Sequence, residues 1–206
     1  MSLARLLQLA SPTLPVGAYS YSQGLESAVE AGVVHDAASA ERWIGDVLEL
    51  SLARLELPLV RRQIDDPTQE RNDFFLATRE TAELRAETLQ MGHSLAKLLG
   101  DVGIAVPFEQ PAFPTAYALA VRHWGIPPGD ALVAYLWSWL ENQVMAAVKA
   151  VPLGQTAGQK ILLALGGRLE AIAGNPLGEE RWSNFAPGLA RLSAKHETQY
   201  TRLFRS

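Results

Sequence analysis

The amino-acid sequence predicts an all-α fold: a single domain, residues 1–206, of about eight to ten helices around a buried central helix at residues 131–148. Three observations support this prediction. Apolar residues recur at steps of three and four along residues 36–62 and 84–98, which is the spacing of one helix face. Residues 131–148 are apolar nearly all round and contain no Gly or Pro, as expected of a helix enclosed by others. No stretch alternates apolar and polar residues as a strand would.

The first helices are expected to be short. A helix at residues 2–10 should stop where two prolines force extended backbone over residues 11–17. Residues 18–26 are dense in aromatic and hydroxyl side chains and lead into the next helix, for which Ser20 or Ser22 can serve as N-cap.

A long amphipathic helix follows from about residue 36 to residue 62, with Pro58 expected to kink or end it. Asp66 and Pro67 together predict the start of a helix, with the aspartate as N-cap and the proline at the first helical position. Helical material is then expected over residues 67–99. Its apolar positions alternate by four and three, a spacing that predicts a helix-packing seam.

The rest of the chain reads as connections and helices around the central one. Residues 104–114 contain three prolines and form a surface connection, and a short helix follows at 115–124. After the central helix, residues 161–173 form a second apolar helical run, and a last helix begins near Pro187.

The corner at residues 148–160 joins the two apolar runs and is unusually polar. A Walker-type phosphate loop needs Gly, four residues and Gly-Lys-Ser/Thr after a strand. Here two glycines are three residues apart and a helix precedes them, so the sequence argues against nucleotide binding. A helix N-terminus covered by Gln155 or Thr156 explains part of the polarity, but not the two lysines, Lys149 and Lys160.

Composition excludes several classes of function. The chain has no cysteine, so it has no disulfide, no thiolate nucleophile and no thiolate metal ligand. Its net charge of −4 argues against nucleic acid as a partner. Glu141 at the middle of the central helix argues against a membrane span, and the short, broken N-terminal apolar run is not a secretory signal, so a cytoplasmic protein is expected.

The scattered histidines give no metal-binding or catalytic pattern, so no metal site and no catalytic residue is predicted. An interaction protein fits the sequence better than an enzyme. One alternative is a small all-α enzyme that uses His196 or His123 as general base, with Glu197 or Glu141 as partner. Another is a helical scaffold unrelated to metal.

The C-terminal tail, defined here as residues 200–206, ends with Leu203 and Phe204 between two arginines. That composition suits docking into a groove with charged flanks. A frayed helix end folded onto the chain's own core explains it equally well. The sequence leaves open that the tail is flexible.

Four sequence blocks carry a family resemblance: LLQLASPTLPVGAYSYSQGLE (6–26), ETAELRAETLQMGHSLAKL (80–98), AAVKAVPLGQTAGQ (146–159) and SAKHETQYTRLFRS (193–206). In this order, and over nearly the whole chain, they resemble the UreF family of urease accessory proteins. One departure is Ala18-Tyr19, where Gly-Phe is expected.

The resemblance implies a non-catalytic all-helical chaperone that forms a homodimer. It also implies binding to UreD (also called UreH), to the GTPase UreG and to apo-urease, with GTP hydrolysis coupled to nickel delivery. Nickel is expected to be handled in transit rather than held as a cofactor. The partner-binding residues carried over from the family are Tyr19, Ser20, Gly24, Glu26, Glu80, Arg85, Gly92, Lys149, Gly154, Gln155, Thr156, Arg202, Phe204 and Arg205. The corner around Gln155 and the first block are expected to face UreG, and the tail to become ordered when UreD binds.

Overall fold

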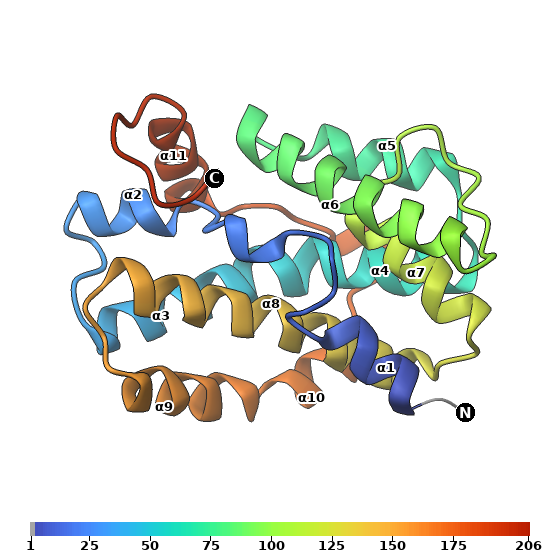
Figure 1. Ribbon diagram of the computed structural model, residues 1–206, viewed down its shortest axis with the longest axis horizontal. Helices are drawn as coiled ribbons and strands as arrows, with labels where there is room; N and C mark the ends of the chain where they lie inside the picture. The colour runs from blue at the N-terminus through green and yellow to red at the C-terminus, as the bar shows by residue number, and fades with distance from the viewer. Residues whose placement is uncertain (1–2) are drawn as a thin grey trace.

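A computed structural model describes residues 3–206, and these residues form an all-helical fold without strands (Figure 1). The elements are α1 (Leu3–Ala10), η1 (Ala18–Ser20), α2 (Leu25–Glu30), α3 (Ala37–Val47), η2 (Leu48–Glu56), α4 (Leu57–Asp65), α5 (Gln69–Ala77), α6 (Ala82–Asp101), α7 (Phe113–His123), α8 (Pro128–Ala150), α9 (Gln155–Gly166), α10 (Leu169–Ala173), η3 (Glu179–Arg181) and α11 (Pro187–His196). The predicted all-α class is confirmed. Since α3, η2 and α4 are continuous, the described residues contain ten separate α-helical rods.

The central helix is α8, and it is longer than the predicted 131–148 because it begins at Pro128. A proline is tolerated in the first helical turn, where its missing N–H would have no partner within the helix. Of the helices in residues 3–206, six pack against α8: α1, α2, α3, α4, α9 and α10. Figure 1 shows α8 in the middle of the bundle. No helix in residues 3–206 combines the length and apolar character needed to cross a bilayer.

Pro58 does not end the long helix, which runs on to Asp65. The segment before it, η2, has π-helical geometry. A proline at position 58 cannot donate to the carbonyl of Arg54, four residues earlier. That carbonyl instead accepts from the backbone N–H of Ser183 at 3.2 Å. A distant loop therefore supplies the donor that the proline lacks.

The helical material predicted at 67–99 is two helices, α5 and α6, separated by a turn at residues 78–81. Each begins with a threonine N-cap: the hydroxyl oxygens of Thr68 and Thr81 accept from backbone N–H groups three residues on, at 3.3 and 3.2 Å. Asp66, predicted as a cap, instead follows the end of α4. The hydroxyl two residues later takes the capping role.

The corner between α8 and α9 differs from its prediction in one respect. Gly154 is the N-cap of α9, and neither Gln155 nor Thr156 makes a capping hydrogen bond. Gly158 lets the two helices approach closely, since an added Cβ would lie 2.9 Å from a methyl group of Val148. The run predicted at 161–173 begins earlier and breaks between α9 and α10.

Candidate partner-binding site

The C-terminal tail lies against α2 and α6, so sequence blocks that are far apart along the chain meet here. Figure 1 shows the C-terminus beside α2 and α11. Gly24 precedes α2 with φ of +76°, and an added Cβ would lie 3.2 Å from the backbone nitrogen of Ser193 in α11. Only glycine adopts this conformation readily and also allows so close an approach. Helices α2 and α11 are thereby brought together beside the tail.

Glu26 is the main anchor of the tail. One of its carboxylate oxygens accepts from the backbone N–H of Leu203 at 2.7 Å, and the other accepts from that of Phe204 at 2.9 Å. The second oxygen also lies 3.3 Å from Nε2 of His196. Glu26 is buried, and hydrogen bonds to a buried ionised group are among the strongest in proteins.

His196, at the end of α11, joins this anchor to α6. Its ring is fully buried, with Nδ1 2.7 Å from a carboxylate oxygen of Glu83. Arg202 donates to the other oxygen of Glu83 at 2.6 Å. Two carboxylates, an imidazole and a guanidinium thus form one network that spans α2, α6, α11 and the tail.

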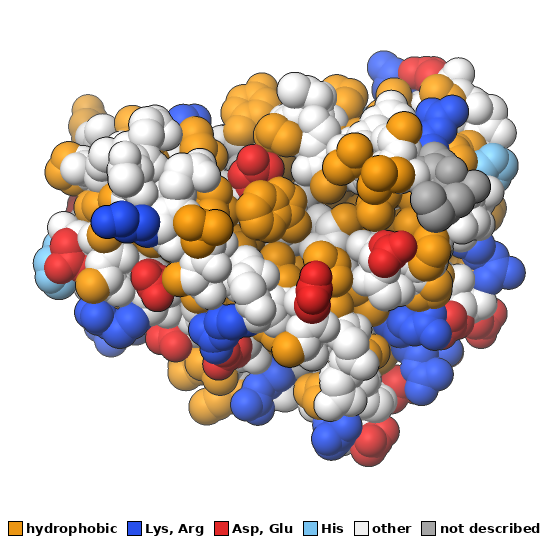
Figure 2. Space-filling model, turned by 90° about the horizontal axis from the view of Figure 1, so that it is seen from below, with side chains coloured by type: hydrophobic (Ala, Val, Ile, Leu, Met, Phe, Trp, Pro, Cys, Tyr) orange, Lys and Arg blue, Asp and Glu red, His pale blue; other side chains and the backbone are white. Residues whose placement is uncertain are grey.

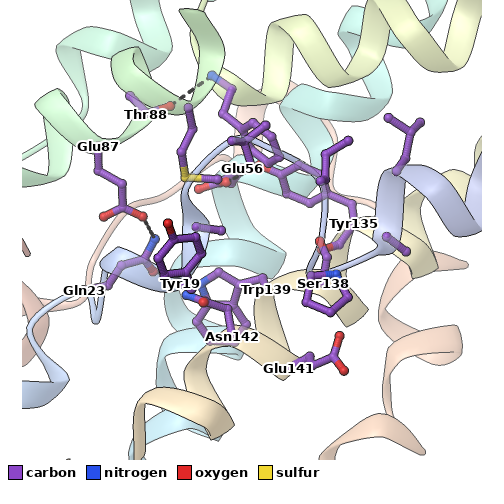
Figure 3. A pocket seen from close by; sticks show the side chains of 18 of the residues that line it. Tyr19, Gln23, Glu56, Glu87, Thr88, Tyr135, Ser138, Trp139, Glu141 and Asn142 are labelled. Carbon is purple, nitrogen blue, oxygen red and sulfur yellow. Dashed lines mark hydrogen bonds between the residues drawn. The ribbon is translucent and has the colours of Figure 1, made fainter. Parts of the chain in front are cut away.

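The last residue is fixed by a second set of contacts. The carbonyl oxygen of Ser206 accepts from the backbone N–H of Ser22 at 2.8 Å. Its hydroxyl donates to Glu87 at 2.8 Å. The amide of Gln23 donates to the other oxygen of Glu87 at 2.7 Å, as Figure 3 shows. Burial raises the pKa of Glu87 to about 7, against the lowering effect of these two hydrogen bonds.

The raised pKa of Glu87 makes stability depend on pH. The folded protein holds this proton up to about pH 7, whereas the unfolded chain releases it near 4.5, so the folded state binds more protons between these values. Stability therefore falls as pH rises from about 4.5 to 7. In the protein itself, the free energy of unfolding should fall by an amount on the order of 3 kcal/mol over this pH range, and Glu87→Gln should abolish this fall. Urea unfolding of both proteins at pH 5 and 7.5 measures the difference, and equal pH slopes would contradict this prediction.

Six of the predicted residues meet at the tail. Besides Glu26, the carbonyl of Ser20 accepts from the backbone N–H of Arg205 at 2.8 Å. Phe204 is only 6% exposed, and Nζ of Lys149 lies 5.7 Å from its ring centroid, a cation–π contact. Arg202 completes the set through Glu83.

The other predicted residues have different surroundings. Gly154, Gln155 and Thr156 are exposed at the start of α9, and no hydrogen bond found in residues 3–206 joins them to the tail. Tyr19 and Glu80 are exposed. Arg85 donates to the carbonyl of Leu76 at 2.7 Å. The role of Gly92 is packing: an added Cβ would lie 2.0 Å from the carbonyl oxygen of Pro111.

The tail is packed against the chain's own body. Of the two arrangements considered from its composition, docking on a partner or folding onto its own core, the structure shows the second. Phe204 and Ser206 are buried. Tyr200 is fully exposed and Leu203 is 67% exposed. The tail therefore buries Phe204 against the body and at the same time exposes Tyr200 and Leu203.

The pairs of the enzyme alternative do not form. His196 contacts Glu26 and Glu83 rather than Glu197, whose carboxylate accepts from the backbone N–H of Ala82 at 2.8 Å. His123 is exposed at the end of α7. Across the part of the chain that the structure describes, no three His, Asp or Glu side chains are grouped as metal ligands would be.

Glu83 and Glu87 were missed by the sequence analysis, although a signal for them exists. They lie four residues apart on one face of α6, where two like charges destabilise a helix unless something else binds them.

Ser20 or Ser22 was expected as the N-cap of α2, but the N-cap is Gly24. The hydroxyl of Ser22 still accepts from the backbone N–H of Glu26 at 3.3 Å. Its contact with Ser206 has no counterpart in any local pattern.

The fold and these contacts define a single-domain helical protein whose most elaborate feature is the attachment of its own last residues. A family model described as UreF matches residues 34–166. The chain is 59% identical to the urease accessory protein UreF of Azoarcus sp. (strain BH72), with 100% of this chain and 96% of the relative covered. It is 52% identical to the protein of the same name from Dechloromonas aromatica (strain RCB), with 100% and 98% covered. The chain belongs to the UreF family of urease accessory proteins.

Proposed function

We propose that this protein is a non-catalytic chaperone that bridges UreD and the GTPase UreG on apo-urease. In this role it couples GTP hydrolysis to the delivery of nickel, which passes through the assembly as cargo. The proposal extends the family's named role in urease maturation to specific partners. It also places the protein in the cytoplasm, where these partners would be met.

The observation that carries the proposal is the difference in exposure between the two neighbouring apolar side chains of the tail. Phe204 is buried, while Leu203 beside it is exposed. The network around Glu26 and Glu83 holds the backbone of the tail, so Leu203 is presented at a fixed position. A backbone that is already fixed loses little further entropy when a partner binds it. We assign this surface to UreD. Because the tail is already packed on the body, we give up the expectation that UreD binding orders it.

The surface for UreG is assigned to Tyr19, Lys149 and the corner at Gln155 and Thr156. All four side chains are exposed, and the last three come from the end of α8 and the start of α9. Exposed tyrosine suits a protein interface because one end is apolar and the other forms hydrogen bonds. This surface does not include Leu203, although Lys149 links the two through its contact with Phe204.

A separate apolar face is assigned to the homodimer. Figure 2, seen from the side of α9 and α10, shows hydrophobic side chains gathered over the middle of this face, with a few acidic side chains among them. A groove here is lined by Leu3, Leu7 and Trp137, all of them exposed, and Leu163 of α9 is also exposed. Large exposed apolar patches mark sites of protein contact.

The proposed function is tested by reconstitution. Apo-urease, UreD, UreG, GTP and Ni²⁺ are combined with and without this protein, and urease activity is measured over time. Activation that depends on the protein and on GTP hydrolysis supports the proposal. Equal activation without it would overturn the bridging role.

Leu203→Asp should weaken binding to UreD at least tenfold and leave the melting temperature unchanged. The reason is that the side chain is exposed and only a partner would bury it. Val102→Asp is the matched control, because Val102 is also exposed but lies at the far end of α6. Titration of UreD against each variant by calorimetry gives the affinities. Unchanged affinity for Leu203→Asp would remove the tail from the interface.

A further inference from the structure

A cavity of about 230 Å³ lies among α6, α7, α8 and the segment that joins α1 to η1. Figure 3 shows the side chains around it, including Glu87 of α6, Tyr135 and Trp139 of α8, and Glu56 of η2. Most of its wall is apolar or aromatic, with Leu84, Met91 and Phe113 on one side. A space of this size and character admits a small organic molecule.

Arg79 lines this cavity from the turn between α5 and α6. Its side chain is only 9% exposed, and its guanidinium carbon lies 4.3 Å from the ring centroid of Phe75. Nη1 lies 3.5 Å from a carboxylate oxygen of Glu56. Nε and Nη2 are buried and have no hydrogen-bond partner in residues 3–206.

The two unpartnered nitrogens of Arg79 are on the same edge of the guanidinium group. Their N–H bonds run parallel and match the two oxygens of a carboxylate. Leaving such donors unpaired in the interior is unfavourable, so this edge selects a ligand with two acceptor atoms. Thr88, buried on the cavity wall, adds a hydroxyl whose oxygen accepts from the backbone N–H of Phe113 at 3.2 Å and whose proton stays available.

The charges around the cavity come from η2, α6, α8 and the turn that carries Arg79. Glu56 of η2 pairs with Arg79 and also accepts from the hydroxyl of Tyr135. On α8, Lys149 is a second cation, and burial raises the pKa of Glu141. On α6, burial raises the pKa of Glu87 to about 7. A carboxyl group with a raised pKa is more often neutral, and a neutral group does not repel an added anion. The cavity can therefore accept one further negative charge.

We propose that this cavity binds a small monocarboxylic acid, with its carboxylate on the Nε–Nη2 edge of Arg79 and its apolar body against Leu84, Met91 and Phe113. The proposal goes beyond the bridging function, which needs no small-molecule ligand. The cavity wall includes Tyr19 and Lys149, both assigned to the UreG surface, so the bound acid lies directly beneath that surface.

The experiment uses benzoate as the probe, with benzyl alcohol and benzylamine as neutral and cationic analogues of similar shape. Binding is followed by NMR on the full chain, through the indole N–H of Trp139, which donates to Gln23 at 2.8 Å on the cavity wall. Benzoate should bind at least tenfold more tightly than either analogue. Equal affinity for benzoate and benzyl alcohol would overturn the proposal.

Arg79→Lys keeps the positive charge and removes the paired donors, and it should weaken benzoate binding at least tenfold. Arg168→Lys is the matched control, since Arg168 pairs with Glu49 at the surface. Should Arg79→Lys fail to fold, Met91→Phe fills the cavity instead and should abolish binding. Benzoate affinity that survives either folded variant would place the probe elsewhere and refute the assignment.

The pH dependence gives an independent measurement. A bound carboxylate near Glu87 favours the protonated form of that residue, so benzoate should bind more tightly at pH 6 than at pH 8. Glu87→Gln should make the affinity the same at both values. An affinity that does not change with pH in the unmodified protein would contradict the proposed location.

Discussion

Glu26→Ala should release the C-terminal tail and lower the free energy of unfolding by about 3 kcal/mol, because it removes the acceptor of two backbone N–H groups in a buried site. The change also leaves His196 buried with one carboxylate instead of two. Urea unfolding gives the stability, and timed trypsin digestion with mass spectrometry reports cleavage after Arg202. Faster loss of the last four residues is the expected signature.

Glu30→Ala is the control, since Glu30 lies one turn further along the same helix and is exposed. It should change stability by less than about 0.5 kcal/mol, as surface substitutions usually do. In the proposed bridging role, Glu26→Ala should also abolish UreD binding while Glu30→Ala retains it. A Glu26→Ala protein with an intact, protease-resistant tail would show that Phe204 alone holds the segment in place.

The helices could be predicted because the signals for them are local. The apolar stripe of residues 36–62 and the apolar run of 131–148 each lie within one element, so their periodicity is visible without knowledge of the fold. The same applies to the stop at Pro12 and Pro15. Pro58 was expected to kink or end its helix; it does not end it, and the donor for the carbonyl of Arg54 comes from Ser183, far along the chain.

The candidate site could be predicted only in part, and the reason is again distance along the chain. The resemblance selected Glu26, Lys149, Arg202 and Phe204 from three separate blocks, but no local pattern states that they touch. Glu26 reaches residues 177 and 178 positions away through their backbone N–H groups, which every residue type except proline possesses. Such contacts leave no trace in side-chain composition.

Gly92, which the resemblance assigns to partner binding, has a packing role in the fold that its sequence context does not reveal. Gly92→Ala should destabilise the protein by more than about 3 kcal/mol, because the new methyl group would overlap backbone atoms that cannot turn aside. A Cβ added at Gly92 would lie 2.0 Å from the carbonyl oxygen of Pro111 and 2.7 Å from the carbonyl carbon of Ala112. Helix α6 would have to move away from the start of α7. Thermal unfolding followed by circular dichroism measures the loss.

Gly100→Ala on the same helix separates this clash from the intrinsic effect of the substitution. Nothing lies within 4 Å of a Cβ built at Gly100, so the added methyl group meets open space. Alanine is favoured over glycine in a helix by about 1 kcal/mol, and this variant should therefore be slightly more stable than the unmodified protein. Opposite signs for the two glycines would establish that Gly92 is needed for the approach of α6 to α7. If Gly92→Ala instead folded normally and lost only partner binding, Gly92 would return to the interface to which the family resemblance assigned it.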